Sequence, residues 1–207
     1  MTVTIDVWTD IVCPWCFIGI ERLEKVVAAS SADVEIRHHP FQLDPSTPPA
    51  GRNIREWLSK KYGRDPTPMF ATVEAAAKEG GLALDMSRQS MAYPTLAAHT
   101  LIANAGTPEQ SHALARALFH AYFVDALNIA DASVLAAIAE THGIPADVAS
   151  ALATSKAALE ATRTEVAQAR RLGIQGVPFF LFDEKLAVSG AQPEALLREA
   201  IAQASAG

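Results

Sequence analysis

Apolar and polar residues alternate near both ends of the chain, whereas the long middle segment repeats its apolar residues at helical spacing. The alternation in residues 3–8 predicts a strand with one buried face. Residues 17–27 carry apolar residues three or four apart and predict a helix. Residues 34–38 alternate again and predict a second strand, parallel to the first if both share a sheet. The helix between them is expected to turn four charged residues towards water: Glu21, Arg22, Glu24 and Lys25.

The middle of the chain predicts an almost entirely helical segment. Residues 44–52 are rich in proline and predict a linker. Beyond them, segments of helical composition are separated by short breaks that contain glycine, proline, asparagine or aspartate. One helix start is well marked, because Thr107 offers a cap and Pro108 suits the first helical position. The predicted helices span residues 54–62, 68–79, 93–105, 108–125, 132–142, 146–153 and 156–172.

Strand character returns after Gly173, a residue type that commonly ends helices. Residues 177–182 form a dense apolar run of strand length. A charged turn follows, and residues 186–189 predict the second strand of a hairpin. A last helix is predicted from about residue 192, with its apolar residues facing inward.

The two ends therefore give β-α-β and β-β-α, separated by helices. This pattern predicts an α/β protein with a thioredoxin-like fold and a large all-helical insertion domain. Residues 1–44 and 173–207 would form the thioredoxin-like domain, and residues 45–172 the insertion. Joining the two ends into one sheet is an inference from the order of the elements.

Composition limits the possible partners and locations. The 207 residues are 50% hydrophobic, enough for a sizeable core. A formal net charge of -6 argues against a nucleic-acid partner, which usually needs a basic face. No apolar run reaches membrane-spanning length, and the first residues lack the pattern of a signal peptide. We therefore expect a cytoplasmic protein, provided that Met1 is the natural initiator. Both a monomer and a homodimer fit the sequence.

Cys13 and Cys16 are the only cysteines in the chain, and they flank Pro14 and Trp15 between the first strand and the first helix. A Cys-x-x-Cys pair in that context predicts redox chemistry. The alternative is half of a zinc site, which needs further ligands. His38 and His39 are adjacent, so on a strand they point to opposite faces and cannot both reach one ion. We therefore predict no metal site.

The two thiols are expected to have different roles. Cys13 lies at the first helical turn, where unpaired N–H groups and the helix dipole favour a thiolate, the reactive species. Cys16 lies about one turn further on and is expected to be the resolving thiol that releases a mixed disulfide. Pro14 suits a first helical turn. Trp15 is expected to be partly exposed, because its surroundings must admit a substrate.

Four segments resemble the DsbA family of oxidoreductases, in particular its cytoplasmic FrnE-like branch. Residues 10–19 (Asp-Ile-Val-Cys-Pro-Trp-Cys-Phe-Ile-Gly) resemble the active-site segment. Residues 39–45 resemble the segment after the second strand, and residues 173–180 the loop that carries a cis-proline. Residues 189–192 resemble the C-terminal motif. The similarity runs from about residue 4 to residue 201.

The resemblance implies thiol–disulfide exchange on protein disulfides or small-molecule thiols, with no tightly bound cofactor. It also implies that the peptide bond between Val177 and Pro178 is cis and that this bond packs beside the two cysteines. Val177 could then present its N–H and C=O groups to an extended substrate. The alternative for Pro178 is an edge-strand proline, which fits poorly with so apolar a run.

His99 lies on the apolar side of its predicted helix. A hydrogen-bonded core histidine is the more common explanation for such a residue, and a histidine that faces the cleft is the alternative. We include His99 among the substrate-binding candidates, which are Pro14, Trp15, Val177, Pro178 and His99.

The chain departs from the family pattern in three ways. Trp15 replaces the histidine found between the cysteines of strongly oxidising relatives, so we expect a weaker oxidant. Val7 stands where many thioredoxin-fold enzymes carry a buried acid, which leaves water as the default proton acceptor for Cys16. The extra C-terminal cysteines of some FrnE-like proteins are missing.

Two rival functions remain open. The 2-hydroxychromene-2-carboxylate isomerases and kappa-class glutathione transferases share the fold and would use glutathione as a co-substrate. They typically place serine where Cys13 stands and an acid where Gln192 stands, and both differences count against this function. A chaperone that uses the cleft without its thiols is the other alternative. The main prediction is a thiol–disulfide oxidoreductase or isomerase.

Overall fold

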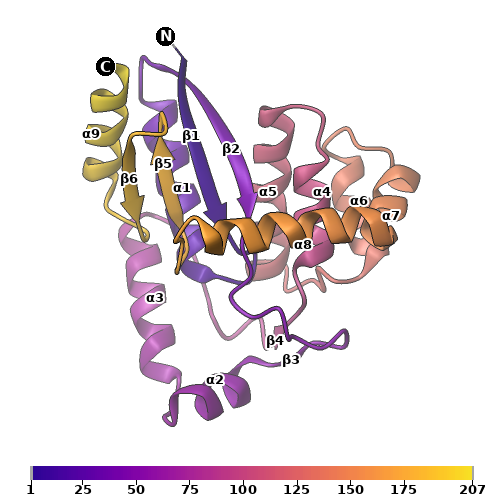
Figure 1. The fold of residues 1–207 in the computed structure, drawn as a ribbon. Coiled ribbons are helices and arrows are strands. Elements are labelled where there is room, and N and C mark those ends of the chain that lie inside the picture. The colour runs from indigo at the N-terminus through magenta and orange to yellow at the C-terminus, as the bar shows by residue number, and fades with distance from the viewer. Residues whose placement is uncertain (1, 207) are drawn as a thin grey trace.

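The computed structural model describes residues 2–206, and its ribbon is drawn in Figure 1. The strands are β1 (Thr2–Thr9), β2 (Asp33–Pro40), β3 (Arg52–Asn53), β4 (Met91–Ala92), β5 (Phe179–Phe182) and β6 (Leu186–Ser189). The helices are α1 (Pro14–Ala28), α2 (Ile54–Tyr62), α3 (Thr67–Glu79), α4 (Leu96–Ala103), α5 (Pro108–Phe123), α6 (Ala132–Glu140), α7 (Ala146–Thr154), α8 (Lys156–Arg171) and α9 (Glu194–Ser205).

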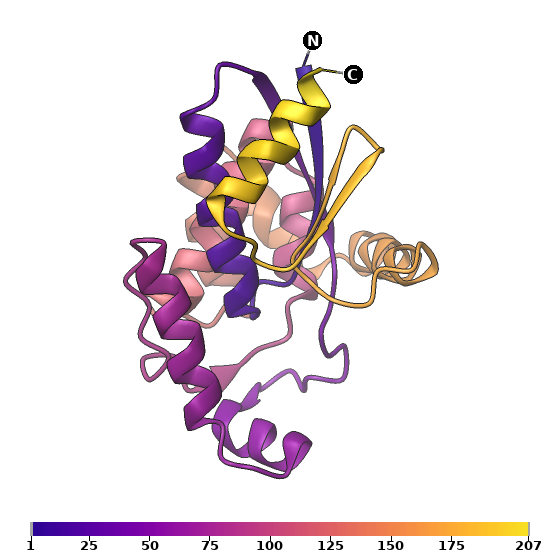
Figure 2. The ribbon, with the colours of Figure 1, turned by 90° about the vertical axis from the view of Figure 1, so that its left-hand side faces the viewer.

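The central sheet joins the two ends of the chain. Its strand order is β2-β1-β5-β6, with β1 parallel to β2 and antiparallel to β5. In β1, Val7 lies opposite His38 of β2 on one side and opposite Phe180 of β5 on the other. The predicted thioredoxin-like fold is thereby confirmed. Figure 2 shows that β1 begins and α9 ends at the same end of the molecule.

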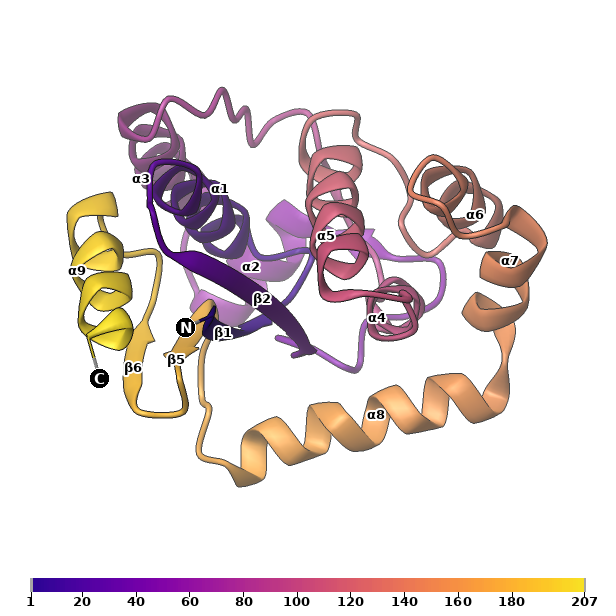
Figure 3. The same ribbon diagram turned by 90° about the horizontal axis from the view of Figure 1, so that it is seen from above.

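Helices cover both faces of this sheet. Figure 3 shows α1 and α3 on one side and α8 crossing the other side, with α4 to α7 gathered beyond β2. The alternation of β1 explains this arrangement, because Val3, Ile5 and Val7 are fully buried in the main core. Trp8 points the other way, into a smaller core that it shares with Phe41, Ala169 of α8 and Ile174 just after α8. The edges of the sheet are formed by β2 and β6.

The insertion shares one continuous core with the thioredoxin-like part. The Phe17 ring of α1 is nearly parallel to the rings of Phe119 and Phe123 of α5, with centroids 5.8 and 5.6 Å away. The predicted cap of α5 is confirmed, since the Thr107 hydroxyl accepts a hydrogen bond from the Gln110 N–H. A short antiparallel pair, β3 and β4, was not predicted; each strand has two residues, too few to produce a visible pattern.

Two sequence predictions need correction. The helix expected over residues 93–105 is shorter, because α4 runs from Leu96 to Ala103. Arg22 was expected to face water, but it is only 9% exposed. Its guanidinium donates to the carbonyl oxygens of Ala191 at 2.7 Å and Ala76 at 3.0 Å. These acceptors lie on segments far away in sequence, so the periodicity of α1 alone could not reveal them.

Among residues 2–206, no helix is both long enough and apolar enough to span a bilayer.

Candidate active site

The cysteine segment forms the junction between β1 and α1. Cys13 has an extended backbone conformation and is the residue that precedes the first turn of α1, and Pro14 is the first residue of that helix. The Cys13 N–H donates to the Asp10 carbonyl at 2.9 Å. The Cys13 carbonyl accepts the N–H of Cys16 at 3.0 Å, so the helix begins within the motif. The strand and the helix therefore fix both thiols at one end of the sheet.

The two thiols differ in their surroundings. Both are free, with Cys13 4% exposed and Cys16 fully buried. The Cys13 thiol donates to the Val177 carbonyl at 3.7 Å. Burial raises the pKa of the Cys16 thiol well above its ordinary value of 9.0, and the hydrogen bond and charge of Cys13 raise it further. A backbone hydrogen bond from Asp10 partly offsets this rise, and the Asp10 carboxylate adds to it. At neutral pH, Cys16 is therefore a protonated thiol beneath the more accessible Cys13.

The loop before β5 forms the other side of the thiol site. The Val177–Pro178 peptide bond is cis. Pro178 is buried, and its carbonyl accepts the Gly190 N–H at 2.8 Å. The Val177 carbonyl accepts the hydrogen bond from the Cys13 thiol, whereas no acceptor for the Val177 N–H lies within residues 2–206. This N–H is therefore free to bind a substrate backbone next to Cys13.

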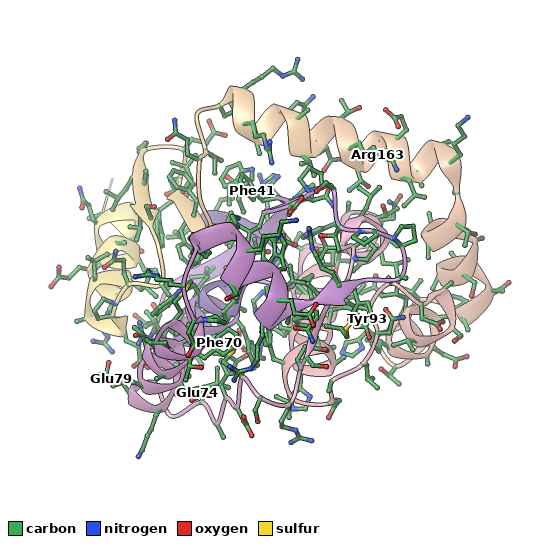
Figure 4. The ribbon with its side chains drawn as sticks, turned by 90° about the horizontal axis from the view of Figure 1, so that it is seen from below. Phe41, Phe70, Glu74, Glu79, Tyr93 and Arg163 are labelled. Carbon is green, nitrogen blue, oxygen red and sulfur yellow. The ribbon has the colours of Figure 1, made fainter. Side chains whose placement is uncertain are left out.

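A cleft of about 460 Å³ opens beside Cys13. One wall is the cysteine motif with Pro14, Trp15 and Val177. The opposite wall comes from the insertion and is mostly apolar or aromatic; Figure 4 labels Phe70 and Tyr93, two of its members. The remaining apolar residues of this wall are Ile54, Trp57, Leu58, Tyr62, Met69, Val73, Met86, Ala92, Tyr122 and Phe123, and Val12 and Leu43 of the thioredoxin-like part also line the cleft.

Two cations line the same cleft near Trp57. The Arg52 guanidinium lies 4.5 Å from the centre of the Trp57 ring, and the Lys61 ammonium lies 4.7 Å from it. Arg52 is also held by Asp44 Oδ2 at 2.7 Å and by the Thr47 hydroxyl at 2.6 Å. Cations over an indole face stabilise its position. The charge of Arg52 is offset by Asp44, so Lys61 is the cation near Trp57 that has no carboxylate beside it within residues 2–206.

The structure brings together most of the candidates named from the sequence. Cys13, Pro14, Trp15 and Val177 line the cleft, and Trp15 is partly exposed. Pro178 is buried and lies against Gly19 of α1.

His99 is the exception and requires a correction. It does not line the cleft, and it is only 2% exposed. Its Nε2 lies 3.3 Å from Asp10 Oδ1, so it is a hydrogen-bonded core histidine, the first of the two explanations considered. Direct contact with substrate is not compatible with this position.

Asp10 is a site residue that the sequence analysis missed. It is 1% exposed, lines the cleft and accepts the Leu43 N–H at 2.8 Å through Oδ2. The one available signal was a carboxylate three residues before Cys13, inside an otherwise apolar segment. Its partner His99 lies 89 positions away, too far to be paired with it by spacing.

Within residues 2–206, no group of three or more His, Cys, Asp or Glu residues is arranged to hold a metal ion.

Comparison with known proteins identifies relatives of this chain. A family model described as DSBA-like thioredoxin domain matches residues 4–202. A crystal structure of a probable DsbA oxidoreductase from Streptomyces coelicolor is 32% identical, with a TM-score of 0.87 over 99% of this chain and 90% of that one.

Two more distant structures share the fold. A 2-hydroxychromene-2-carboxylate isomerase is 17% identical, with a TM-score of 0.76 over 97% of this chain and 95% of that one. A cytosolic disulfide reductase, DsbM from Pseudomonas aeruginosa, was solved with glutathione. It is 20% identical, with a TM-score of 0.61 over 97% of this chain and 98% of that one.

Proposed function

Because the chain belongs to the DSBA-like thioredoxin domain family, we propose that it is a thiol–disulfide oxidoreductase that uses Cys13 and Cys16 as a redox-active dithiol. One observation carries the proposal. The Cys13 sulfur lies 3.7 Å from the Val177 carbonyl, at the mouth of a cleft large enough for a substrate. A disulfide that enters this cleft meets the thiol and the free Val177 N–H together.

The reaction has two exchange steps. The Cys13 thiolate attacks one sulfur of a substrate disulfide, forms a mixed disulfide and releases the first substrate thiolate. The Cys16 thiolate then attacks the Cys13 sulfur, closes the Cys13–Cys16 disulfide and releases the second substrate thiolate. The substrate gains two electrons and the protein loses two. The reverse sequence oxidises a dithiol, and the relative stability of the two redox forms sets the direction.

The cleft favours substrates with apolar groups beside the disulfide. Its wall in the insertion is built from aromatic and aliphatic side chains, among them Trp57, Met69 and Phe70. Burial of an apolar side chain there contributes about 25 cal/mol per Å² of covered surface. We therefore propose protein disulfides or apolar thiols as the substrate class. We also propose that the reaction takes place in the cytoplasm, where dithiols are kept reduced.

A glutathione-dependent isomerase or transferase is the second candidate, favoured by the overall similarity to the isomerase structure. Two features argue against it. Position 13 is a cysteine and not the serine typical of those enzymes, so its thiol would attack the disulfide of oxidised glutathione. The Gln192 side chain is neutral and donates to the Ser189 carbonyl at 2.8 Å, so it offers no charge to a glutathione amine. Glutathione is therefore proposed as a thiol co-substrate.

The test is an equilibrium titration of the dithiol in glutathione buffers, read by alkylation and mass spectrometry. We expect a reversible two-electron transition in the unmodified protein. Cys13→Ser should abolish exchange, and Cys16→Ser should accumulate mixed disulfides at Cys13. Full turnover by Cys13→Ser would contradict the proposal. So would an unmodified protein that forms no Cys13–Cys16 disulfide while Cys13→Ala still binds glutathione. Suppression of aggregation by the double Cys→Ala variant would instead support a chaperone.

A further inference from the structure

Helix α2 turns one face towards the thiol cleft. The residues of this face line the cleft and recur three or four positions apart, as on one side of a helix: Ile54, Trp57, Leu58, Lys61 and Tyr62. The residues between them are polar and do not line the cleft: Arg55, Glu56, Ser59 and Lys60. The cleft face of α2 is therefore apolar except for Lys61.

This face is open in the free protein. All nine residues of α2 are at least partly exposed, and Tyr62 is 49% exposed. Figure 1 shows α2 at the bottom of the molecule, away from the central sheet. The apolar face of a surface helix normally packs against a core. Contiguous apolar surface that stays exposed marks binding sites in soluble proteins. The cleft face of α2 therefore has the character of a binding surface.

The helix is anchored at its start and has room at its end. The Ile54 N–H donates to the Ser90 carbonyl at 2.9 Å. The Arg55 guanidinium lies 4.8 Å from the centre of the Phe70 ring of α3. At the other end, α2 stops at Gly63, where a Cβ atom would meet nothing within 4 Å. The start of the face is thus fixed beside the cleft, and its end can adjust to a ligand.

Trp57 is the central residue of this face, and two cations hold its ring. The Arg52 guanidinium and the Lys61 ammonium lie 4.5 and 4.7 Å from the ring centre. Arg52 is itself held by Asp44 and Thr47. A side chain that is positioned before binding loses little freedom when a ligand arrives. Central tryptophans are among the residues that contribute most to binding.

The position of this face identifies its occupant. Cys13, Pro14 and Val177 line the same cavity as α2, so a molecule that covers the face is part of the substrate that reacts with Cys13. From Ile54 to Tyr62 the face is about 12 Å long, at 1.5 Å per residue. This length matches about three or four residues of an extended chain. Glutathione has carboxylates and an amine but no apolar side chain, so it would leave the face uncovered.

We propose that α2 is the substrate-recognition helix of this protein and that Trp57 is its specificity-determining residue, which selects polypeptide disulfides with a large apolar side chain next to the cysteine. The inference rests on the proposed thiol–disulfide exchange and narrows its substrate class.

The experiment compares two peptide disulfides that differ only beside the cysteine. They are the symmetric dimers of acetyl-Ser-Phe-Cys-Phe-Ser-amide and of acetyl-Ser-Ala-Cys-Ala-Ser-amide. Reduced protein is mixed with an excess of one dimer, and acid quenching, alkylation and mass spectrometry give the rate of Cys13–Cys16 disulfide formation. The selectivity is the rate constant for the phenylalanine peptide divided by that for the alanine peptide. Both peptides react with the same thiols, so a change in thiol reactivity alone leaves this ratio unchanged.

The unmodified protein should have a selectivity of about 30, as expected for burial of one large apolar side chain. In Trp57→Ala we expect the selectivity to fall below about 3, because the central apolar contact is lost. A selectivity close to unity in the unmodified protein, or an undiminished selectivity in Trp57→Ala, overturns the inference. Absence of any reaction with both peptides and with glutathione disulfide overturns the proposed function instead.

Lys60→Ala is the matched control, because Lys60 is an exposed residue of α2 that does not line the cleft. Its selectivity should equal that of the unmodified protein. A loss as large as that in Trp57→Ala would mean that any change in α2 lowers the selectivity, and it would overturn the role of Trp57.

A second measurement leaves α2 unchanged. Cys16→Ser holds each peptide on Cys13 as a mixed disulfide, and hydrogen–deuterium exchange is followed in fragments that cover residues 54–62. Exchange should be about fivefold slower with the phenylalanine peptide than with the alanine peptide, because apolar contact stabilises the helix against local opening. Equal exchange in the two adducts overturns the inference even if Trp57→Ala does not fold.

Discussion

Gly19 of α1 lies directly against the ring of Pro178. A Cβ atom on Gly19 would come 2.9 Å from Pro178 Cγ and 3.2 Å from Phe180 Cζ. Real Cβ atoms essentially never approach another heavy atom so closely, and a proline ring cannot swing aside as a flexible side chain can. The absence of a side chain at position 19 therefore sets how closely the helix that carries the cysteines approaches the loop that carries Val177.

We predict that Gly19→Ala destabilises the protein and weakens exchange. Overpacking of a tight core costs about 1–3 kcal/mol. Alanine in a helix recovers about 1 kcal/mol relative to glycine. The net loss in the free energy of unfolding is thus about 1 kcal/mol, measured by urea denaturation. The Val177 carbonyl would also move away from Cys13, so thiol–disulfide exchange should slow.

Gly176→Ala is the control for Gly19→Ala. A Cβ at position 176 would meet nothing within 4 Å, so this change should leave the free energy of unfolding within about 0.5 kcal/mol. Equal stabilities of Gly19→Ala and Gly176→Ala would mean that the helix and the loop are not in the tight contact described above.

We further predict that Arg22→Leu destabilises the protein by about 2–3 kcal/mol. The guanidinium bonds the carbonyls of Ala191 and Ala76, and hydrogen bonds to charged groups are each worth about 1.5–3 kcal/mol. Leucine would leave these carbonyls without the donor. Arg198→Leu, at an exposed position of α9, should change the free energy of unfolding by less than about 0.5 kcal/mol. A stability loss no larger than that of Arg198→Leu would show that water replaces the guanidinium.

The four strands of the central sheet and most helices could be predicted because their signals are local. Helix α2 begins and ends where expected, since Asn53 caps it and Gly63 has the left-handed conformation that ends it. The apolar residues that alternate along β1 form its buried face. Such features depend only on neighbours within a few positions, so one sequence is enough.

The interior polar contacts could not be predicted, because each joins segments far apart in the sequence. Arg22 lies among charged residues of a helix face, and nothing nearby indicates that carbonyls from α3 and from the loop before α9 surround it. Asp10 and His99 each look like an isolated polar residue in an apolar segment. Only the tertiary contact between α4 and the loop after β1 makes them a pair, and this contact changes the expected role of His99.

Alkylation should distinguish the two thiols. We predict that reduced protein treated with limiting iodoacetamide at pH 7.5 is labelled at Cys13 well before Cys16. The thiolate is the reactive species, and burial, followed by the effect of Cys13, raises the pKa of Cys16. Peptide mapping by mass spectrometry gives the ratio. Equal labelling of both cysteines in the folded protein would contradict the different environments of the two thiols, and urea-unfolded protein, where the difference should vanish, is the control.

His38 should make the protein sensitive to mild acid. Burial, followed by the charges of His112, His39 and His99, lowers the pKa of His38 well below its ordinary value of 6.5. Its Nε2 lies 2.9 Å from His112 Nδ1, and its buried Nδ1 has no hydrogen-bond partner within residues 2–206. Below pH 6.5 the unfolded chain binds a proton at this residue and the folded protein does not, so the free energy of unfolding falls as pH falls.

We therefore predict that His38→Gln has a flatter dependence of stability on pH. Between pH 6.5 and 5, the unmodified protein should lose about 1–2 kcal/mol more than the variant, as expected for one group that stays neutral on folding. Urea denaturation at several pH values measures the difference. His120→Gln is the control, because His120 is 58% exposed and its replacement should leave the slope unchanged. Parallel pH profiles for His38→Gln and the unmodified protein would mean that His38 is protonated equally in the folded and unfolded states.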